Sequence, residues 1–212
     1  KDWIVEQSRV LVHVDEKSSA LSAGIPPELL VPWKWQEERI AIGAEIPADS
    51  ELFFLTHGLE SPVDQLEGIQ EWMQGKPVEL GRILTVVNCA LLQANGKLQG
   101  WYDACIHFSD AVLLNGRKGV PGKWAEDWIQ SYQKQNFPCI FRLVKKDRIK
   151  NPAEILIPEA RRISLAFEDP DDAWDEQGRR VEEPYFLRDE AGRRKKWVPK
   201  ITDFLCNSQE TG

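Results

Sequence analysis

The chain has 212 residues, 42% of them hydrophobic and 29% charged, so it can bury a core and is neither disordered throughout nor collagen-like. Its formal net charge of −7 argues against nonspecific electrostatic binding to nucleic acid. No apolar run approaches the roughly 18–20 residues that span a bilayer, and no secretory pattern opens the chain. We therefore expect a cytoplasmic protein that binds neither nucleic acid nor membrane.

The spacing of the cysteines and histidines gives little support to a metal site. No two of the four cysteines form a C-x-x-C pair, and the histidines form no H-x-x-x-H pair, so we expect buried, reduced thiols and no metal ligands. These residues are Cys89, Cys105, Cys139 and Cys206, and His13, His57 and His107.

Strand-like and helix-like patterns alternate from the start of the chain. The apolar, β-branched run Arg9–Val14 and the run Glu51–Leu55 predict two strands. Ser61 followed by Pro62 predicts a helix start, because serine accepts a hydrogen bond from a free backbone N–H and proline has none to lose. Helical spacing of apolar residues continues until Gly75, which is expected to end the helix.

The same alternation continues to about residue 144. Strands are predicted at Arg82–Val87, Ala111–Leu114 and Cys139–Val144, with helices at Trp101–Phe108 and around Trp124–Tyr132. This order predicts an α/β fold with a mostly parallel, doubly wound sheet, in which ligands bind at the carboxyl ends of the strands. The residues at those ends are Asp15-Glu16, Thr56-His57-Gly58, Asn88 and Asn115-Gly116-Arg117-Lys118.

The residue composition of the chain changes toward the C-terminus. We therefore expect a first domain at residues 1–150 and a linker with a small β appendage at 151–212. The acidic run 168–176 is expected to be a solvated linker. A β-hairpin is predicted where Tyr185–Leu187 faces Trp197-Val198 across a glycine-containing turn.

Four segments, in order along the chain, resemble CobW-type GTPases. Leu52–Pro62 is similar to the family's hydrophobic strand that runs into Glu-Thr-Thr-Gly-Leu-Ala-Asp-Pro. Ile83–Asn88 resembles its Val-Thr-Val-Val-Asp strand, and Ile106–Asn115 resembles its Gln-Ile-Ala-Phe-Ala-Asp-Val-Val-Leu-Leu-Asn segment. Val14–Glu16 is similar to its Val-Asn-Glu. The resemblance covers about residues 8–145 and implies a P-loop fold, with relatives such as HypB and UreG that act as metallochaperones.

The resemblance also implies parts that this chain lacks. A Walker A loop, G-x-x-x-x-G-K-[ST], holds phosphates and magnesium, and no such motif is present. In the family this loop precedes the strand predicted at Arg9–Val14, so it either lies upstream of Lys1 or is lost. Leu55 stands where the family has a glutamate for the magnesium and water network, and Lys118 stands where it has a guanine-reading aspartate. The family's Cys-x-Cys-Cys metal motif is absent, and Trp33 and Trp35 lie in roughly that region. They are expected in a proline-containing loop, where packing in the core is favoured over an exposed anchor for a partner.

Four residues remain for contacts with GTP and magnesium under this resemblance. They are Glu16, Thr56, Gly58 and Asn115. Glu16, Gly58 and Asn115 also have ordinary readings: an exposed acid at a strand end, a turn glycine, and an asparagine that caps a turn. His57 could act as a base beside a phosphate or be a structural histidine. No catalytic residue is predicted.

Three functional hypotheses follow from the sequence. The first is a divergent nucleotide-binding protein, impaired in GTP hydrolysis and linked to metal homeostasis or metallocofactor assembly. The second is a pseudo-GTPase that binds a protein partner or a metalloprotein client without catalysis. The third is an unrelated α/β enzyme with His57, Asp103 and Cys105 as candidates, although no nucleophile motif surrounds them.

Overall fold

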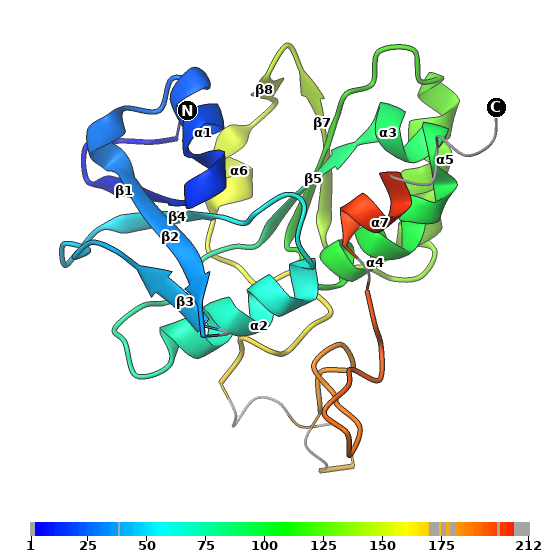
Figure 1. Ribbon diagram of the computed structural model, residues 1–212. Helices are drawn as coiled ribbons and strands as arrows, with labels where there is room; N and C mark the ends of the chain where they lie inside the picture. The colour runs from blue at the N-terminus through cyan, green and yellow to red at the C-terminus, as the bar shows by residue number, and fades with distance from the viewer. Residues whose placement is uncertain are drawn as a thin grey trace. The chain divides into compact units, whose positions relative to one another are not determined.

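The computed structural model describes residues 3–37, 39–169, 174, 177–178, 181–198 and 200–205. Most of the predicted acidic linker and Cys206 lie outside these residues. The chain divides into two compact units, Lys1–Lys76 and Pro77–Gly212. Each unit is built around its own four-stranded sheet, so the single doubly wound sheet predicted from the sequence is found as two sheets (Figure 1). The general α/β class is confirmed.

The first unit holds a mixed sheet in the order β3-β2-β1-β4. β1 pairs in parallel with both β2 and β4, and only β3 runs antiparallel. β1 is central and almost wholly buried, which fits its continuous apolar run. The strands are β1 (Ser8–His13), β2 (Leu30–Gln36), β3 (Arg39–Ile42) and β4 (Glu51–Leu55). The helical segments are the 3₁₀ turn η1 (Val14–Glu16), α1 (Lys17–Ser22), the 3₁₀ turn η2 (Pro27–Leu29) and α2 (Pro62–Met73).

Helix α2 begins and ends as its sequence predicts. The Ser61 hydroxyl accepts a hydrogen bond from the backbone N–H of Asp64, and Pro62 is the first helical residue. Within α2, Gly68 faces Trp35: a Cβ at Gly68 would lie 2.6 Å from the Trp35 ring. Glycine therefore lets the helix approach the sheet closely.

Trp33 and Trp35 lie in a strand, although the sequence suggested a proline-containing loop. Trp33 is fully buried, with its ring centroid 5.1 Å from that of Phe54. Its Nε1 donates a hydrogen bond to the carbonyl oxygen of Leu55, at 3.1 Å. Trp33 therefore packs the core of the first unit rather than anchoring a partner.

The second unit holds a sheet in the order β5-β6-β7-β8, with β5, β6 and β7 parallel and β8 antiparallel. Every strand predicted between residues 82 and 144 is present within two residues of its expected bounds. The strands are β5 (Leu84–Asn88), β6 (Ala111–Asn115), β7 (Ile140–Lys145) and β8 (Arg148–Ile149). The helical segments are α3 (Cys89–Ala94), the 3₁₀ turn η3 (Gly96–Leu98), α4 (Gln99–His107), α5 (Gly122–Gln133), α6 (Pro152–Leu156) and α7 (Ile201–Leu205).

The core of the second unit lies where α4 and α5 pack with the sheet. Val112 and Leu114 of β6 are fully buried, and Trp128 and Tyr132 of α5 pack against the same cluster. The three described cysteines are free and buried, as expected. Burial raises the pKa of the Cys139 thiol to about 12, so it stays protonated near neutral pH.

The C-terminal segment folds back onto the second sheet through a buried ion pair. Asp110 is fully buried, and Arg162 Nη1 donates to both of its carboxylate oxygens, at 3.1 and 3.0 Å. The backbone N–H groups of Ile83 and Arg161 also donate to Asp110. The predicted hairpin forms a tight turn with a single antiparallel bridge between Arg188 and Arg194, not two regular strands. A bridge of this size adds little to the sheet structure of the unit.

Candidate functional site

The carboxyl ends of β1 and β4 meet at one edge of the first sheet. The two strands are parallel, and Val12 pairs with Leu55, so the residues that follow each strand share that edge. Glu16, just beyond β1, has Oε1 3.8 Å from the position that a Cβ on Gly58 would take. Thr56 is exposed between β4 and Gly58. Three of the four predicted contact residues therefore lie in one region.

Asn115, the fourth predicted residue, belongs to the second unit. It is the last residue of β6, in register with Asn88 at the end of β5. Its Oδ1 accepts a hydrogen bond from the N–H of Gly116, at 2.8 Å, and Asn88 Oδ1 accepts one from the N–H of Leu91. Gly116 has a φ of +61°, and a Cβ there would lie 2.7 Å from Asn88 Oδ1. These contacts support the turn-capping reading of Asn115.

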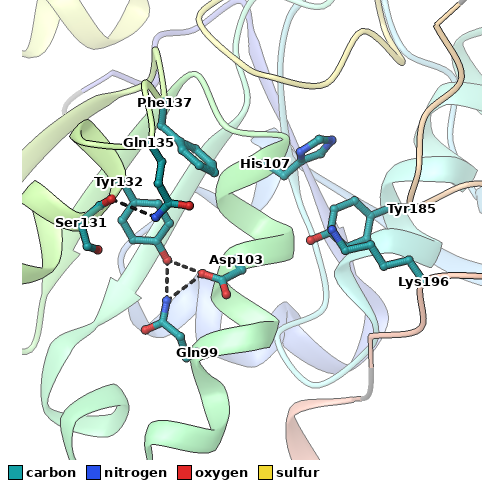
Figure 2. Close-up of a pocket in the computed structure, with 9 residues that line it drawn as sticks. All are labelled: Gln99, Asp103, His107, Ser131, Tyr132, Gln135, Phe137, Tyr185 and Lys196. Carbon is teal, nitrogen blue, oxygen red and sulfur yellow. Dashed lines mark hydrogen bonds between the residues drawn. The ribbon is translucent and has the colours of Figure 1, made fainter.

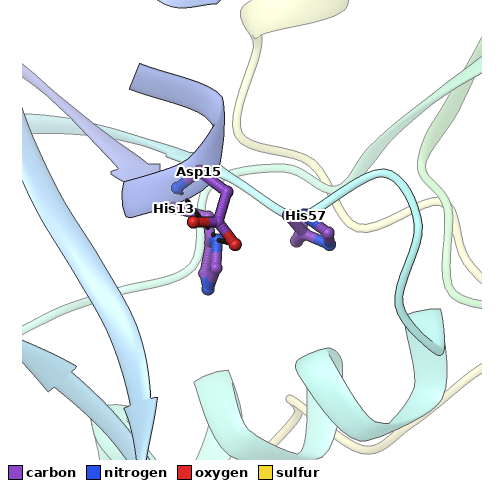
Figure 3. A group of neighbouring side chains, drawn as sticks. All are labelled: His13, Asp15 and His57. Atoms are coloured by element: carbon purple, nitrogen blue, oxygen red, sulfur yellow. Dashed lines mark hydrogen bonds and ion pairs between the residues drawn. The ribbon is translucent and has the colours of Figure 1, made fainter. Parts of the chain in front are cut away.

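Two histidines and an aspartate gather at the edge of the first sheet, as Figure 3 shows. His13 is the last residue of β1, Asp15 lies in the turn that follows, and His57 follows β4. One ligand atom from each lies within 4.8 Å of the other two. The side chains of His13 and His57 are each 11% exposed, whereas that of Asp15 is 73% exposed. Local spacing could not reveal this group, because its histidines come from different strands.

His13 is held as a neutral ring. Its Nδ1 accepts a hydrogen bond from the Asp15 N–H at 3.3 Å, so that nitrogen carries no proton. Burial, and then the neighbouring His57 ring, lower the pKa of His13 below its ordinary value, although the carboxylates of Asp15 and Glu16 oppose them. The ring packs edge-on against Trp33, with centroids 4.8 Å apart. Packing and the hydrogen bond together fix the ring in place.

His57 is fixed through its backbone by Gln65 of α2. Its N–H donates to Gln65 Oε1 at 2.5 Å, and Gln65 Nε2 donates to its carbonyl oxygen at 3.0 Å. Gln65 is 1% exposed, so solvent does not compete for this pair of bonds. The ring of His57 is not fixed by hydrogen bonds in this way. Its Nδ1 is buried with no hydrogen-bond partner, and its Nε2 lies 4.0 Å from Glu16 Oε1.

A comparison with protein-family models, with curated proteins and with solved structures finds no match to this chain. Within the described residues, none of the helices has the length and apolar character required to cross a membrane.

The described residues fit GTP and magnesium only in part. Glu16 offers a carboxylate of the kind that magnesium prefers. Leu55, where the resemblance implies a glutamate, is 42% exposed and has no polar side-chain atom. Lys118 is exposed and can accept no hydrogen bond from a guanine edge. No reaction step can therefore be assigned to residues of this chain.

The second unit contains a cavity of about 430 Å³ beside α4 and α5 (Figure 2). Polar side chains that line it are already hydrogen-bonded to one another. Tyr132 Oη and Gln99 Nε2 donate to Asp103 Oδ1, at 2.6 and 2.7 Å. Trp128 Nε1 in turn donates to Gln99 Oε1. Burial raises the pKa of Cys105, which keeps its thiol protonated. The hypothesis of an enzyme built on His57, Asp103 and Cys105 gains no support from these contacts, since these polar side chains form a network of internal hydrogen bonds.

Glu183 joins the C-terminal segment to α4 in the second unit. His107 Nε2 lies 3.0 Å from its Oε1, and the Ser164 hydroxyl and the Tyr185 N–H donate to the same carboxylate. Burial disfavours the charged form of Glu183, but these hydrogen bonds outweigh burial and lower the pKa below its ordinary value. The folded chain therefore stabilises the ionised carboxylate.

A Glu183→Gln variant is expected to be less stable than the original chain at pH 7 and equally stable in acid. Because the folded-state pKa of Glu183 is lowered, its contribution is complete above the ordinary value of 4.5 and is lost as the pH falls through the folded-state value. Urea unfolding at a series of pH values between about 3 and 7 measures the difference. The exposed neighbour variant Glu182→Gln is the control; a stability gap that persists unchanged in acid contradicts the prediction.

Proposed function

We propose that this chain is a divergent CobW-type nucleotide-binding protein whose GTP hydrolysis is impaired. The proposal is supported by the way the resembling segments fold. Leu52–Pro62 contains a parallel strand, a turn and the capped start of a helix, while Ile83–Asn88 and Ile106–Asn115 each lead into a parallel strand. The elements thus follow the order that the resemblance implies.

The proximity of Glu16 and Gly58 at neighbouring parallel strand ends carries this proposal. A carboxylate beside an exposed glycine is an arrangement that can accept magnesium near a phosphate, because glycine lets the ligand approach the backbone. Glu16 was predicted from the Val14–Glu16 resemblance and Gly58 from a different segment. Two independent sequence matches therefore converge in space.

Leu55 and Lys118 are the reason to propose impaired hydrolysis. A leucine cannot hold magnesium or orient water, and each missing hydrogen bond to a polar ligand group costs about 1–3 kcal/mol. Since each 1.4 kcal/mol is about tenfold in affinity, weak and poorly guanine-selective binding is the proposed behaviour. The proposed setting is the cytoplasm, in keeping with the free, buried thiols.

The alternative proposal is a pseudo-GTPase that binds a protein partner, including a metalloprotein client, and no nucleotide. The observation that favours it is the state of the two strand-end asparagines of the second unit. The oxygen atoms of Asn88 and Asn115 are both engaged in local backbone hydrogen bonds. Each oxygen therefore already caps a local turn or helix start, and a purine would have to share it.

The double variant Leu55→Glu/Lys118→Asp separates these two proposals. Restoring both side chains is expected to tighten the binding of a fluorescent GTP analogue at least about tenfold in the presence of magnesium, because each adds a polar partner. The matched control is Leu59→Glu/Lys123→Asp, which makes the same changes at two exposed positions. An original chain with no saturable nucleotide binding, and no gain in the double variant, would overturn the nucleotide proposal in favour of the partner-binding module.

A further inference from the structure

We propose that His13, Asp15 and His57 form a binding site for a divalent transition metal ion of the zinc class. The site goes beyond the proposed nucleotide function, because its three ligands are not among the four residues proposed to contact GTP and magnesium. It also requires no cysteine motif, since all three ligand atoms are imidazole nitrogens or a carboxylate oxygen.

The ligand set has the chemistry of a transition-metal site. Two imidazoles and one carboxylate are a common set for zinc, and they leave a coordination position for water or a substrate. Calcium and magnesium prefer oxygen ligands, so the two imidazoles select against them. Glu16 lies beside the set, with Oε1 4.0 Å from His57 Nε2, and can serve as a fourth ligand or hold a bound water.

The distances suit a zinc ion after small side-chain rotations. Bonds of about 2.0–2.2 Å in a tetrahedral site place neighbouring ligand atoms about 3.3–3.6 Å apart. His13 Nδ1 lies 3.5 Å from Asp15 Oδ2, and zinc at this nitrogen would displace its 3.3 Å hydrogen bond from the Asp15 N–H. All three ligand atoms lie within 4.8 Å of one another, and Asp15 is the exposed member whose side chain has room to adjust.

The surroundings of His57 are those of a ligand rather than of a paired core group. His57 has a buried Nδ1 with no hydrogen-bond partner, an arrangement that leaves a polar group unsatisfied unless something binds it. The rings of His13 and His57 lie edge to face with centroids 4.6 Å apart, and one nitrogen of each ring lies within 4.8 Å of the other and of an Asp15 carboxylate oxygen. Trp33 packs against the His13 ring, and the two Gln65 bonds fix the backbone of His57.

Zinc binding to the full chain, free of any purification tag and stripped with a chelator, tests the site by competition with a chromophoric indicator. His13→Asn and His57→Asn are each expected to weaken zinc binding by more than about 100-fold, since losing even an outer partner of a ligand costs up to about that much. Asp15→Asn changes an exposed side chain, so it is expected to weaken binding while leaving the fold intact. Unchanged affinity in all three variants would overturn the site.

Two matched variants control for charge and for histidine number. Asp49→Asn removes an exposed carboxylate in the same unit, at a positive φ that asparagine also tolerates. His107→Asn removes a histidine of the other unit. Both are expected to bind zinc like the original chain, because neither residue belongs to the group. Zinc bound by the cysteines would still be bound in every histidine variant. This result distinguishes it from zinc bound at the proposed site.

Chemical footprinting tests the site without any substitution. Diethyl pyrocarbonate modifies neutral imidazoles, and mass spectrometry identifies the modified residues. Zinc is expected to protect His13 and His57 while leaving the modification of His107 unchanged. Equal modification of His13 and His57 with and without saturating zinc would overturn the proposal. Neither measurement uses nucleotide, so failure of this site and failure of the proposed nucleotide function are separate outcomes.

Discussion

Replacing Asp110 with alanine is expected to lower the free energy of unfolding of the second unit by about 3–5 kcal/mol, the usual cost of removing one member of a buried ion pair. Asp110 is fully buried and the Arg162 side chain is 3% exposed, so the variant leaves a charged guanidinium in the interior with Glu168 as its remaining carboxylate partner. The N–H groups of Ile83 and Arg161 also lose their acceptor. Urea unfolding, followed by circular dichroism, measures the change.

The pair of Arg161 and Glu159 provides the control for this prediction. Their side chains are 41% and 56% exposed, and exposed ion pairs contribute at most about 1 kcal/mol. Glu159→Ala is therefore expected to have a small effect. The double variant Asp110→Ala/Arg162→Ala should lose less than the sum of the two single variants, because it removes the stranded charge. Equal losses for Asp110→Ala and Glu159→Ala would contradict the assignment of Asp110 as the anchor of the C-terminal segment.

Replacing Trp33 with alanine is expected to cost the first unit about 3–5 kcal/mol of stability, as for other large aromatic side chains in cores. Trp33 is fully buried, contacts Phe54 and His13 through its ring, and donates to the Leu55 carbonyl. Alanine leaves a cavity and an unpaired carbonyl oxygen. Trp197→Ala is the matched control, because its side chain is 69% exposed and its loss creates no cavity.

Thermal unfolding of the two tryptophan variants measures this difference. A melting temperature that falls for Trp33→Ala and stays nearly constant for Trp197→Ala is the expected result. The change is read against the original chain under the same buffer and protein concentration. Similar melting temperatures for both variants would contradict the placement of Trp33 in the core of the first unit.

The sequence predicts the regular elements well where local physical signals are strong. Ser61 and Pro62 mark the start of α2, and the apolar runs of β1 and β6 predict their strands, because capping and apolar patterning act within a few residues. Local signals do not predict β2 and β3. Within β2, Pro32 and the alternation of tryptophan and lysine are more typical of a loop. Pairing with β1 and β3 supplies the order that local pattern does not show.

The site shows the same division between local and long-range information. Glu16 and Gly58 could be named from short motifs, each within its own segment. The meeting of His13 and His57 depends on the parallel register of β1 and β4, which no local spacing encodes. One signal was available: each histidine stands at or just after the end of a predicted strand, and such ends share an edge in a parallel sheet.

Gln65 of α2 forms two hydrogen bonds with the backbone of His57, so the loop after β4 is tied to the N-terminal end of α2. Local opening of that helix end therefore releases His57 while β1 keeps His13 in place in the sheet. A metal ion held by both rings would resist this opening, since it binds the closed form alone. Proteolysis or amide exchange at Ser61–Gln65 would therefore slow as the ion binds.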